Sequence, residues 1–414
     1  MPSTHAILAP SGSSRWMRCT PSARLEALEP EKETAYTREG TIAHAMAEIL
    51  LRTALELGWD EWVEDYPDKF RTAYEAVASG KGGTVAGLGN KLREQVDAAV
   101  MEGLDPWEML RTVSDYYCRF VWEDYMDAKY RDPDAVLLVE ARLKLDEFIP
   151  KGFGSSDAVI IQGHEIAVYD LKYGKGVKVS AVGNTQMRCY ALGALLGPGE
   201  LYDIDDVAMV ILQPRLQWTS TDNIKAAALM DWAENELKPA AIMAWMGKGN
   251  FCVGDHCRFC KVAPRCKTLL KWSAALPVQK DGLMDDEELA ETLRKAGTIK
   301  SWIASLEAYA LEQAMAGTPI PGFKVVEGRS LRQIPDQKAA IEALQKAGFS
   351  EDSYLRPREL KTISDLEKLL TKKGFNSILG SYVVKPQGKP TLVEDSDPRP
   401  AMNSASDDFS EYTK

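Results

Sequence analysis

The stretch GSSDAVIIQGHEIAVYDLK at residues 154–172 constrains the fold of this 414-residue chain more than any other. It contains two apolar or alternating runs, 158–162 and 165–169, on either side of Gly163. Runs of this length that are rich in Val and Ile and joined by a short turn containing Gly are typical of a β-hairpin. The sequence therefore predicts two antiparallel strands near the middle of the chain.

Polar side chains lie at the ends of these two runs. Asp157 precedes the first run, and the second run ends in Asp170, Leu171 and Lys172. Because residues two apart in a strand share a face, Asp170 and Lys172 point together while Leu171 faces the core. Carboxylates that bind Mg²⁺, beside an ammonium that orients a water or stabilises charge on phosphate, are suited to phosphodiester hydrolysis. An Asp-x-Lys strand end is more often a solvated surface feature, so this interpretation depends on the rest of the chain.

Two elements before the hairpin carry further candidate residues. Residues 39–58 have apolar side chains at helical spacing and predict a helix that begins at about residue 40, with His44 in its first turn. A lone histidine on a helix is more often a packing or surface residue than a ligand. After a mostly helical stretch, residues 135–145 predict a strand with Glu140 at its centre. Glu140 would reach a metal at the hairpin, but a structural role is favoured.

The elements after the hairpin complete a mixed α/β pattern. Residues 179–196 predict a helix with Gln186 and Tyr190 on one face. Residues 206–213 predict a buried strand, and residues 222–246 a long amphipathic helix. The order of helix, three strands, helix and strand predicts an α/β core with a mixed central sheet flanked by helices.

The cysteines are concentrated near residue 260. Four of the seven lie between residues 252 and 266, and Cys257, Cys260 and Cys266 have C-x2-C-x5-C spacing. Short C-x2-C segments hold thiolates close enough to bind one zinc ion or one iron–sulfur cluster. An odd number of cysteines without a secretory pattern favours such a metal site over a disulfide framework.

Charge and hydropathy limit the class of protein. The net charge of −11 argues against a generally cationic nucleic-acid binder, although a nuclease needs only a local basic groove. No apolar run approaches the roughly 18 residues that cross a bilayer, and the N-terminus lacks a secretory pattern, so we expect a cytoplasmic protein without membrane contact. The residues that would line a basic groove are Lys172, Lys175, Lys178, Arg258, Lys261, Arg265 and Lys267.

The last third of the chain predicts separate, smaller parts. An amphipathic helix is expected over 285–316, within a helical connector at 271–319. Residues 320–390 predict a small α+β domain with a basic segment at 356–373, and residues 391–414 an acidic, disordered tail. The remaining residues, 1–270, then form the main domain, with a helical insertion at about 55–134.

Four motifs in this order resemble a known superfamily. They are GTIAHAMAE with His44, GSSDAV with Asp157, YDLKYGKG with Asp170 and Lys172, and NTQMRCYALGA with Gln186 and Tyr190. Together they resemble the RecB/Cas4-like branch of the PD-(D/E)xK nucleases and, more closely, the phage-encoded family DUF2800. The resemblance implies a restriction-endonuclease-like fold for residues 1–270.

The resemblance also implies roles for these residues. His44, Asp157, Asp170 and the carbonyl of Leu171 would bind Mg²⁺ or Mn²⁺, and Lys172 would orient the attacking water. Gln186 and Tyr190 would hold the substrate strand or support the lysine. The chain departs from the family pattern in having Ser before Asp157 and Asp170 in place of the commoner Glu; both differences preserve a carboxylate.

For the cysteines, the resemblance implies a structural 4Fe–4S cluster. One cysteine upstream of the histidine motif would join three at the end of the domain, which here are Cys19, Cys257, Cys260 and Cys266. Cys252 is then left over as a spare, a packing residue or a competitor for the fourth place. A structural Zn²⁺ is the alternative occupant.

Three functions follow as hypotheses. The first is a metal-dependent DNA exonuclease of phage or prophage origin that acts in recombination or end processing inside a bacterial host. The second is a module on a nuclease fold that binds DNA or a recombination partner, such as a single-strand annealing protein, with little or no cleavage. The third is a zinc-stapled structural or packaging-associated protein. A homo-oligomer, for example a ring, would add processivity to the first.

Overall fold

The computed structural model describes residues 6–30, 34–79, 88–275 and 284–323. All of them lie in one compact unit, which extends from Met1 to Val325. The predicted basic segment at 356–373, the acidic tail and nearly all of the expected small domain at 320–390 lie outside the described residues.

A five-stranded mixed sheet forms the centre of this unit, in the order β1-β2-β3-β4-β5. The strands are β1 (Val136–Lys144), β2 (Phe153–Gln162), β3 (Glu165–Leu171), β4 (Asp206–Gln213) and β5 (Trp218–Lys225). β1, β2 and β3 pair antiparallel, β4 pairs parallel with β3, and β5 pairs antiparallel with β4. The predicted hairpin and the predicted mixed α/β sheet flanked by helices are thus confirmed.

The segment after β4 differs from the prediction. Residues 218–225 form strand β5, so the helix expected over 222–246 begins only at Ala226, as α9 (Ala226–Trp232). It continues through a π-helical segment η5 (Ala233–Leu237) into α10 (Lys238–Met246). β5 is an edge strand made largely of polar residues, none of them buried, so it lacks the apolar alternation that identifies a strand in sequence.

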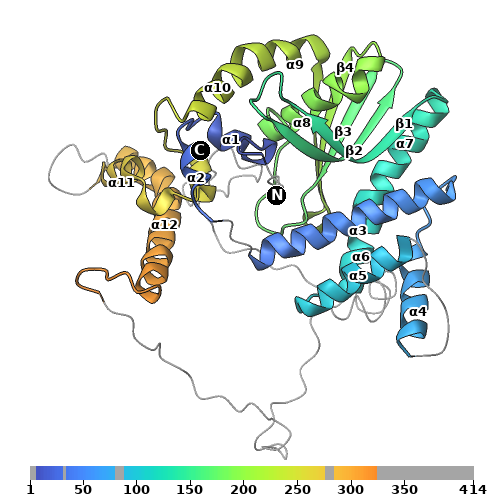
Figure 1. The fold of residues 1–414 in the computed structure, drawn as a ribbon, viewed down its shortest axis with the longest axis horizontal. Coiled ribbons are helices and arrows are strands. Elements are labelled where there is room, and N and C mark those ends of the chain that lie inside the picture. Colours follow the sequence, from blue (N-terminus) through green and yellow to red (C-terminus); the bar gives the residue numbers. More distant parts are fainter. Residues whose placement is uncertain (1–5, 31–33, 80–87, 276–283, 324–414) are drawn as a thin grey trace, which may run out of the picture. The chain divides into compact units, whose positions relative to one another are not determined.

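One helical layer covers the first face of the sheet (Figure 1). Its long element, α3 (Ala35–Leu57), begins about five residues earlier than predicted because the Thr34 and Thr37 side chains form a capping box. Apolar side chains of this layer pack against β1 to β4. The other elements of the layer are α4 (Tyr66–Ala78), α5 (Leu88–Met101), α6 (Pro106–Thr112), the π-helical segment η2 (Val113–Cys118) and α7 (Arg119–Arg131).

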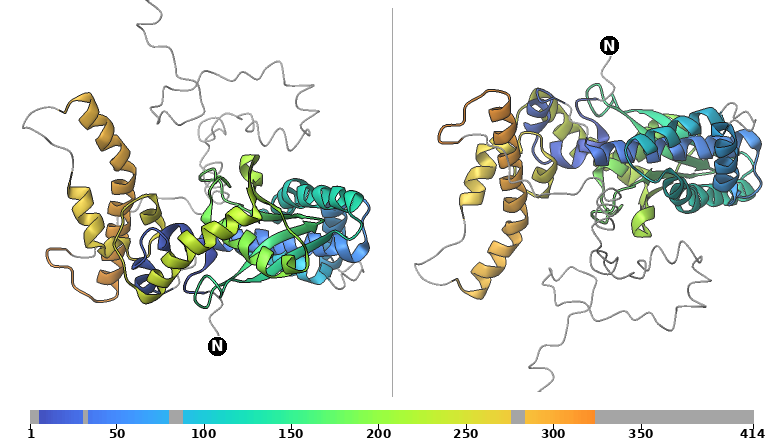
Figure 2. Two further views of the ribbon diagram at one scale, coloured as in Figure 1. Left: turned by 90° about the horizontal axis from the view of Figure 1, so that it is seen from above. Right: turned by 90° about the horizontal axis from the view of Figure 1, so that it is seen from below.

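A second layer covers the opposite face, so the sheet lies between two sets of helices (Figure 2). It contains α8 (Thr185–Leu196), which links the parallel strands β3 and β4, together with α9 and α10. α8 begins six residues later than predicted, because Asn184 caps it by accepting hydrogen bonds from the N–H groups of Gln186 and Met187. Two short helices of the N-terminal segment, α1 (Ser13–Trp16) and α2 (Ser22–Glu26), complete the layer.

The remaining helices follow the cysteine-rich segment. They are α11 (Lys267–Ala274) and α12 (Asp286–Met315), and α12 matches the helix predicted over 285–316. α12 has no buried residue among its 30, in contrast to the helices against the sheet. Among the described residues, no helix combines the length and the apolar character needed to cross a membrane.

Candidate active site

The candidate site lies where β2 and β3 diverge. The last pair of their ladder is Ala158 with Tyr169, so Asp157 and Asp170 face each other beyond the paired region. The side chain of Asp157 replaces the missing backbone acceptor there: its Oδ2 accepts a hydrogen bond from the Leu171 N–H at 2.7 Å. This contact fixes the first carboxylate against the second strand.

Glu140 faces Asp157 from the neighbouring strand β1. The register is the same on both sides of it, with Val139 opposite Ala158 and Ala141 opposite Ser156. Glu140 itself has φ of 50°, which is rare and strained for a residue with a side chain. Val139 packs against the helical layer that contains α3, and Ala141 packs against the layer that contains α8. The alternation of side chains between the two faces of β1 therefore reverses at Glu140. The strained backbone therefore sets the direction of a carboxylate.

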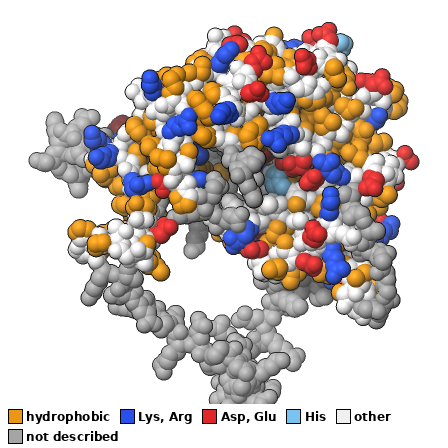
Figure 3. Space-filling view, in the orientation of Figure 1, with side chains coloured by type: hydrophobic (Ala, Val, Ile, Leu, Met, Phe, Trp, Pro, Cys, Tyr) orange, Lys and Arg blue, Asp and Glu red, His pale blue; other side chains and the backbone are white. Residues whose placement is uncertain are grey.

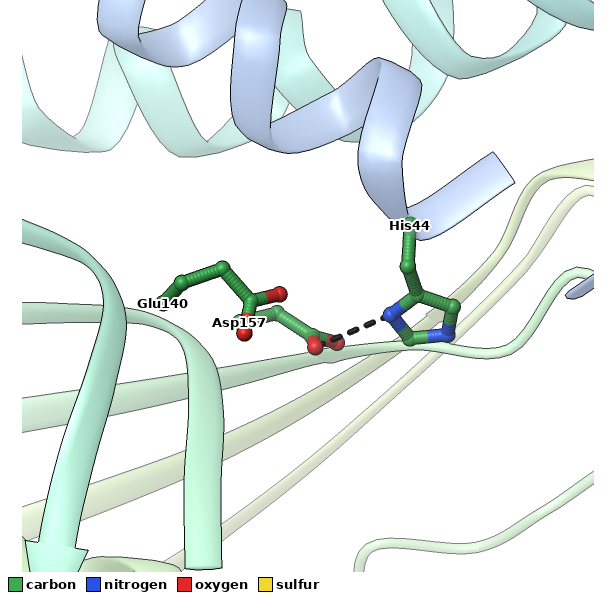
Figure 4. Close-up of side chains that lie close together, drawn as sticks. All are labelled: His44, Glu140 and Asp157. Carbon is green, nitrogen blue, oxygen red and sulfur yellow. Dashed lines mark hydrogen bonds and ion pairs between the residues drawn. The ribbon is translucent and has the colours of Figure 1, made fainter. Parts of the chain in front are cut away.

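Three potential metal ligands meet at this point (Figure 4). The His44 Nδ1 lies 2.9 Å from the Asp157 Oδ1, and one atom each of His44, Asp157 and Glu140 lie within 4.8 Å of one another. The sequence predicts His44 in the first turn of this helix. Because α3 begins at Ala35, His44 lies in the third turn instead. α3 and the two strands together thus supply an imidazole and two carboxylates.

A second group of side chains adjoins the first. The Lys172 Nζ lies 2.7 Å from the Asp170 Oδ2, and the Asp170 side chain is only 4% exposed. Gln186 of α8 bridges this ion pair: its Nε2 donates to the Asp170 Oδ1 at 3.2 Å, and its Oε1 accepts from the Lys172 Nζ at 3.4 Å. The same Nε2 lies 3.1 Å from the Tyr190 hydroxyl one turn further along α8. Lysine, carboxylate, amide and phenol thus form one network.

The charges of His44 and Asp157 stabilise each other. Burial alone would lower the pKa of His44, but the charge and the hydrogen bond of Asp157 raise this pKa to about 9. Burial alone would raise the pKa of Asp157, yet His44 and the Leu171 N–H hold this pKa below its usual range. In the metal-free protein the pair is therefore an imidazolium and a carboxylate at neutral pH.

Lys172 remains an ammonium for a similar reason. Burial would lower the pKa of Lys172, but the paired Asp170 raises this pKa above the ordinary value. Burial raises the pKa of Asp170 despite the opposing effect of Lys172. Burial and then the charge of Asp157 raise the pKa of Glu140 to about 7. A permanent cation at Lys172 suits charge stabilisation and excludes this lysine as a base at neutral pH.

The structure groups the predicted residues somewhat differently from the sequence. We expected His44, Asp157, Asp170 and the Leu171 carbonyl around one metal, and favoured a structural role for Glu140. In the structure Glu140 lies with His44 and Asp157, whereas Asp170 contacts Lys172 and Gln186. An acidic residue in the middle of an apolar strand was the available signal for Glu140.

Five cysteines meet at a separate place. Cys19 and Cys252, with Cys257, Cys260 and Cys266, line one small cavity near α2 and the 3-10 segments η6 (Asp255–Phe259) and η7 (Ala263–Arg265). Burial raises the pKa of Cys19 and of Cys257, and raises the pKa of Cys260 to about 12. The structure thus brings the distant Cys19 to the segment where the family resemblance implies it, together with Cys252.

Polar contacts fix the N-terminal segment beside these cysteines. Glu26, which is buried, accepts a hydrogen bond from the Lys261 N–H at 2.7 Å and pairs with the Arg15 Nε at 2.5 Å. Arg24 donates to the Trp245 carbonyl at 2.5 Å, and its guanidinium lies 4.2 Å from the centre of the Trp245 ring. Protein contacts alone therefore hold Cys19 close to Cys257.

The predicted basic residues lie on two segments of the chain, the loop after β3 and the cysteine-rich segment. Lys175 and Lys178 are exposed beyond β3, and the Lys178 Nζ lies 4.2 Å from the centre of the Trp218 ring. Arg265, on the cysteine-rich segment, is paired with Glu29. On the face shown in Figure 3, Lys and Arg side chains are interspersed with Asp and Glu.

The comparison of the chain with protein families covers almost its whole length. A family model described as a protein of unknown function, DUF2800, matches residues 5–400. The match includes both groups of candidate residues, the acidic site and the cysteines.

Proposed function

Since the chain belongs to the DUF2800 family, which has no assigned function, we propose a function from the site itself: a metal-dependent DNA nuclease of the RecB/Cas4-like PD-(D/E)xK type, acting as an exonuclease. One observation carries this proposal. Two carboxylates, Asp157 and Asp170, converge where two paired strands diverge, with the ammonium of Lys172 2.7 Å from the second. Clustered acids beside a fixed cation suit a reaction that brings a metal and a phosphate together.

The donor atoms present fit a hard divalent cation. His44, Glu140 and Asp157 place an imidazole and two carboxylates within 4.8 Å of one another, a set that Mg²⁺ or Mn²⁺ accepts. Asp170, which lies opposite Asp157 on the neighbouring strand, would add a further carboxylate to these metal ligands. When bound, such a cation acts as a Lewis acid on the phosphate and neutralises part of its charge.

The side chains of the site then have separate tasks. The ammonium of Lys172 orients the attacking water and stabilises the charge that develops on the phosphate oxygens. Asp170 and Gln186 hold Lys172 in place, and the charge of Asp170 keeps it protonated. The Leu171 N–H and His44 fix the rotamer of Asp157. Tyr190, beyond Gln186, supports this amide or contacts the substrate strand.

We propose that four of the five cysteines hold a structural 4Fe–4S cluster. A single zinc ion would place four thiolate sulfurs about 3.8 Å apart, given Zn–S bonds of about 2.3 Å. Among the described residues, no three cysteine sulfurs lie within 4.8 Å of one another. A cluster that binds each sulfur at a different iron tolerates a wider spacing. Cys19, Cys257, Cys260 and Cys266 would be its ligands, with structural zinc as the competing outcome.

The proposed setting is the cytoplasm of a bacterial host during recombination or end processing by a phage or prophage. DNA is the proposed substrate. The alternative is a module that binds DNA or a recombination partner, such as an annealing protein, on a nuclease fold. The strain at Glu140 favours the enzyme, because a binding module gains nothing from aiming a third carboxylate toward phosphates.

The test is cleavage of end-labelled linear and circular DNA by anaerobically purified full-length protein with Mg²⁺, Mn²⁺ or EDTA. Lys172→Met and Asp170→Asn are compared with Lys225→Met and Asp206→Asn. The control pair lies on the same sheet, with the Lys225 Nζ 2.6 Å from the Asp206 Oδ1, but at the far end of the strands.

We expect metal-dependent loss of linear DNA that either site variant abolishes and neither control variant affects. Cleavage of circles as well would make the protein an endonuclease. Binding of DNA without cleavage of either form, with the metal content verified, would overturn the nuclease proposal in favour of the binding module. A brown protein with four irons per chain would support the cluster, and a colourless one with one zinc would reject it.

A further inference from the structure

We propose that Tyr117 is a positioning residue of the acidic site: its hydroxyl donates a hydrogen bond to a water molecule held among the carboxylates. The effect that we expect on turnover rests on the proposed function, whereas the effect that we expect on metal binding can be tested without it. No sequence motif pointed to this residue. It lies in the helical layer, in a segment that precedes β1 in the chain.

The backbone places Tyr117 in the helical layer that packs against α3, the helix that carries His44. It belongs to η2, a π-helical segment of a kind frequent at functional sites, since its wider turn redirects side chains. The neighbouring Cys118 contacts the Ala47 carbonyl, one turn from His44 on α3, with its Sγ 3.7 Å away. Tyr117 itself is fully buried, and it shares one core with Leu171.

The Tyr117 hydroxyl has no hydrogen-bond partner among the described residues. Burial, followed by the charges of Asp157, Asp170 and Glu140, raises the pKa of Tyr117, so the phenol remains protonated close to these carboxylates. Leaving a buried hydroxyl unpaired is costly, and a water molecule with two or more polar neighbours is the usual partner in a polar site. A water here would accept from the phenol and donate to the carboxylates.

Such a water would have a defined orientation. The phenol occupies one of its lone pairs, and the carboxylates accept its two protons, so the other lone pair is free to point toward a cation or a phosphate. Because Tyr117 is fully buried, its hydroxyl adds no steric demand at the open side of the site. The side chain acts through the water, so its loss should affect turnover more than binding of DNA.

The experiment compares Tyr117→Phe with Tyr116→Phe in the full-length protein. Tyr116 is the adjacent residue of η2, and its hydroxyl lies 3.1 Å from the Thr219 Oγ1, away from the acidic residues. Three quantities are measured: the Kd for Mn²⁺, the water-proton relaxation enhancement of the bound Mn²⁺, and kcat and KM on linear DNA. The Tm of the metal-free protein verifies the fold, and Tyr117→Met is a second variant without the hydroxyl.

For Tyr117→Phe we expect threefold to tenfold weaker Mn²⁺ binding, roughly the contribution of one hydrogen bond, and a changed relaxation enhancement. The kcat should fall about tenfold or more with KM within about twofold, since a positioned water matters in the transition state. Tyr116→Phe should leave all of these unchanged. The metal-free Tm of Tyr117→Phe should fall only slightly, because the hydroxyl loses its hydrogen bond to the water but no protein partner.

An unchanged relaxation enhancement, Mn²⁺ Kd and kcat in both Tyr117 variants would overturn the proposal. If the native protein cleaves no DNA, the nuclease function fails, and the Mn²⁺ measurements alone then decide the role of Tyr117. An equal loss in Tyr116→Phe would also reject it, because the effect would then belong to η2 as a whole and not to the Tyr117 hydroxyl.

Discussion

The acidic site and the cysteine site are held together by different kinds of structure. Asp157 and Asp170 lie on two strands of a five-stranded sheet, Lys172 directly follows the second strand, and His44 lies in the third turn of a 23-residue helix. The clustered cysteines lie on 3-10 segments and connecting loops. At the cysteine site, polar contacts such as the hydrogen bond from the Lys261 N–H to Glu26 hold the segments together, in place of the hydrogen bonds of a β-sheet.

This difference indicates what a metal would contribute at each place. At the acidic site, backbone pairing and side-chain hydrogen bonds fix the ligands before any cation arrives, so the cation adds reactivity. At the cysteine site, burial keeps several thiols protonated, and a metal or cluster would have to displace these protons as it joins the segments. Loss of metal should therefore abolish activity at the first site and reduce stability at the second.

The largest effect is expected from Asp157→Asn. The amide can still accept from the Leu171 N–H, so the fold should persist, but the charge that faces His44 and Glu140 is lost. We expect a fall in kcat on the order of 10²- to 10³-fold, as for removal of one major electrostatic element of an active site. Iron content should change little, whereas the Tm of the metal-free protein at neutral pH should fall because the His44–Asp157 ion pair is lost. A variant with full activity would show that this hairpin is not the catalytic centre.

Cys257→Ser should show the opposite profile. Removal of one ligand is expected to release the metal and lower the free energy of unfolding by about 2–5 kcal/mol, the range for losing a covalent crosslink across a long loop. The measurements are iron and zinc content, and urea unfolding followed by circular dichroism. Cys118→Ser is the control for metal content, because Cys118 is a buried cysteine in the layer of helices that contains α3 and does not line the cysteine cavity. If the variant were less stable but kept its full metal content, the metal would not be what stabilises these segments.

The pH dependence of Mn²⁺ binding should follow His44. A metal needs the neutral imidazole, and the pKa of His44 in the metal-free protein is raised to about 9. Below that value a proton competes with the metal, so affinity should rise by up to about tenfold for each pH unit between 7 and 9. His44→Gln should flatten this slope. If the slope persists in His44→Gln, the proton that competes with the metal belongs to another residue.

The same shift predicts how stability changes in the absence of metal. A group with a raised folded-state pKa stabilises the native protein below its unfolded pKa, near 6.5 for His, and this contribution is lost as pH rises. The His44–Asp157 pair should therefore stabilise the metal-free chain at neutral pH and cease to do so through pH 9. Bound Mn²⁺ should reverse this trend.

The sequence predicts the parts of the acidic site that depend on local pattern. The Val- and Ile-rich runs identify β2 and β3, and the spacing of Asp170 and Lys172 places them on one face. It does not predict the φ of Glu140, because that angle follows from the register between β1 and β2. Nor does it identify Tyr117, since an apolar helical pattern gives no sign of a π-helical turn.

The cysteine site shows the same division. The C-x2-C spacing predicts a metal site locally, whereas the approach of Cys19 depends on contacts more than 200 residues apart in sequence, such as Glu26 with Lys261. Cys252 has no spacing that distinguishes it, yet it lines the same cavity as the other four. Local spacing therefore identifies the clustered ligands, and tertiary contacts decide which distant residue joins them.

The smallest effect is expected at the cap of α8. The Asn184 Oδ1 accepts from the Gln186 N–H at 3.0 Å and from the Met187 N–H at 3.2 Å, so it fixes the turn that carries Gln186. Asn184→Ala should lower the free energy of unfolding by about 1 kcal/mol, as for other N-caps. It should also reduce kcat a few-fold, because Gln186 holds both Asp170 and Lys172.

Asp285→Ala is the matched control, since Asp285 caps the exposed helix α12 by accepting from the Glu288 N–H at 2.8 Å. Both variants lose an N-cap, but only α8 contacts the acidic site. Asp285→Ala should therefore leave kcat unchanged. If both variants lowered kcat equally, the effect would reflect general destabilisation, and the rigid support that distinguishes the acidic site from the cysteine site would not extend to α8.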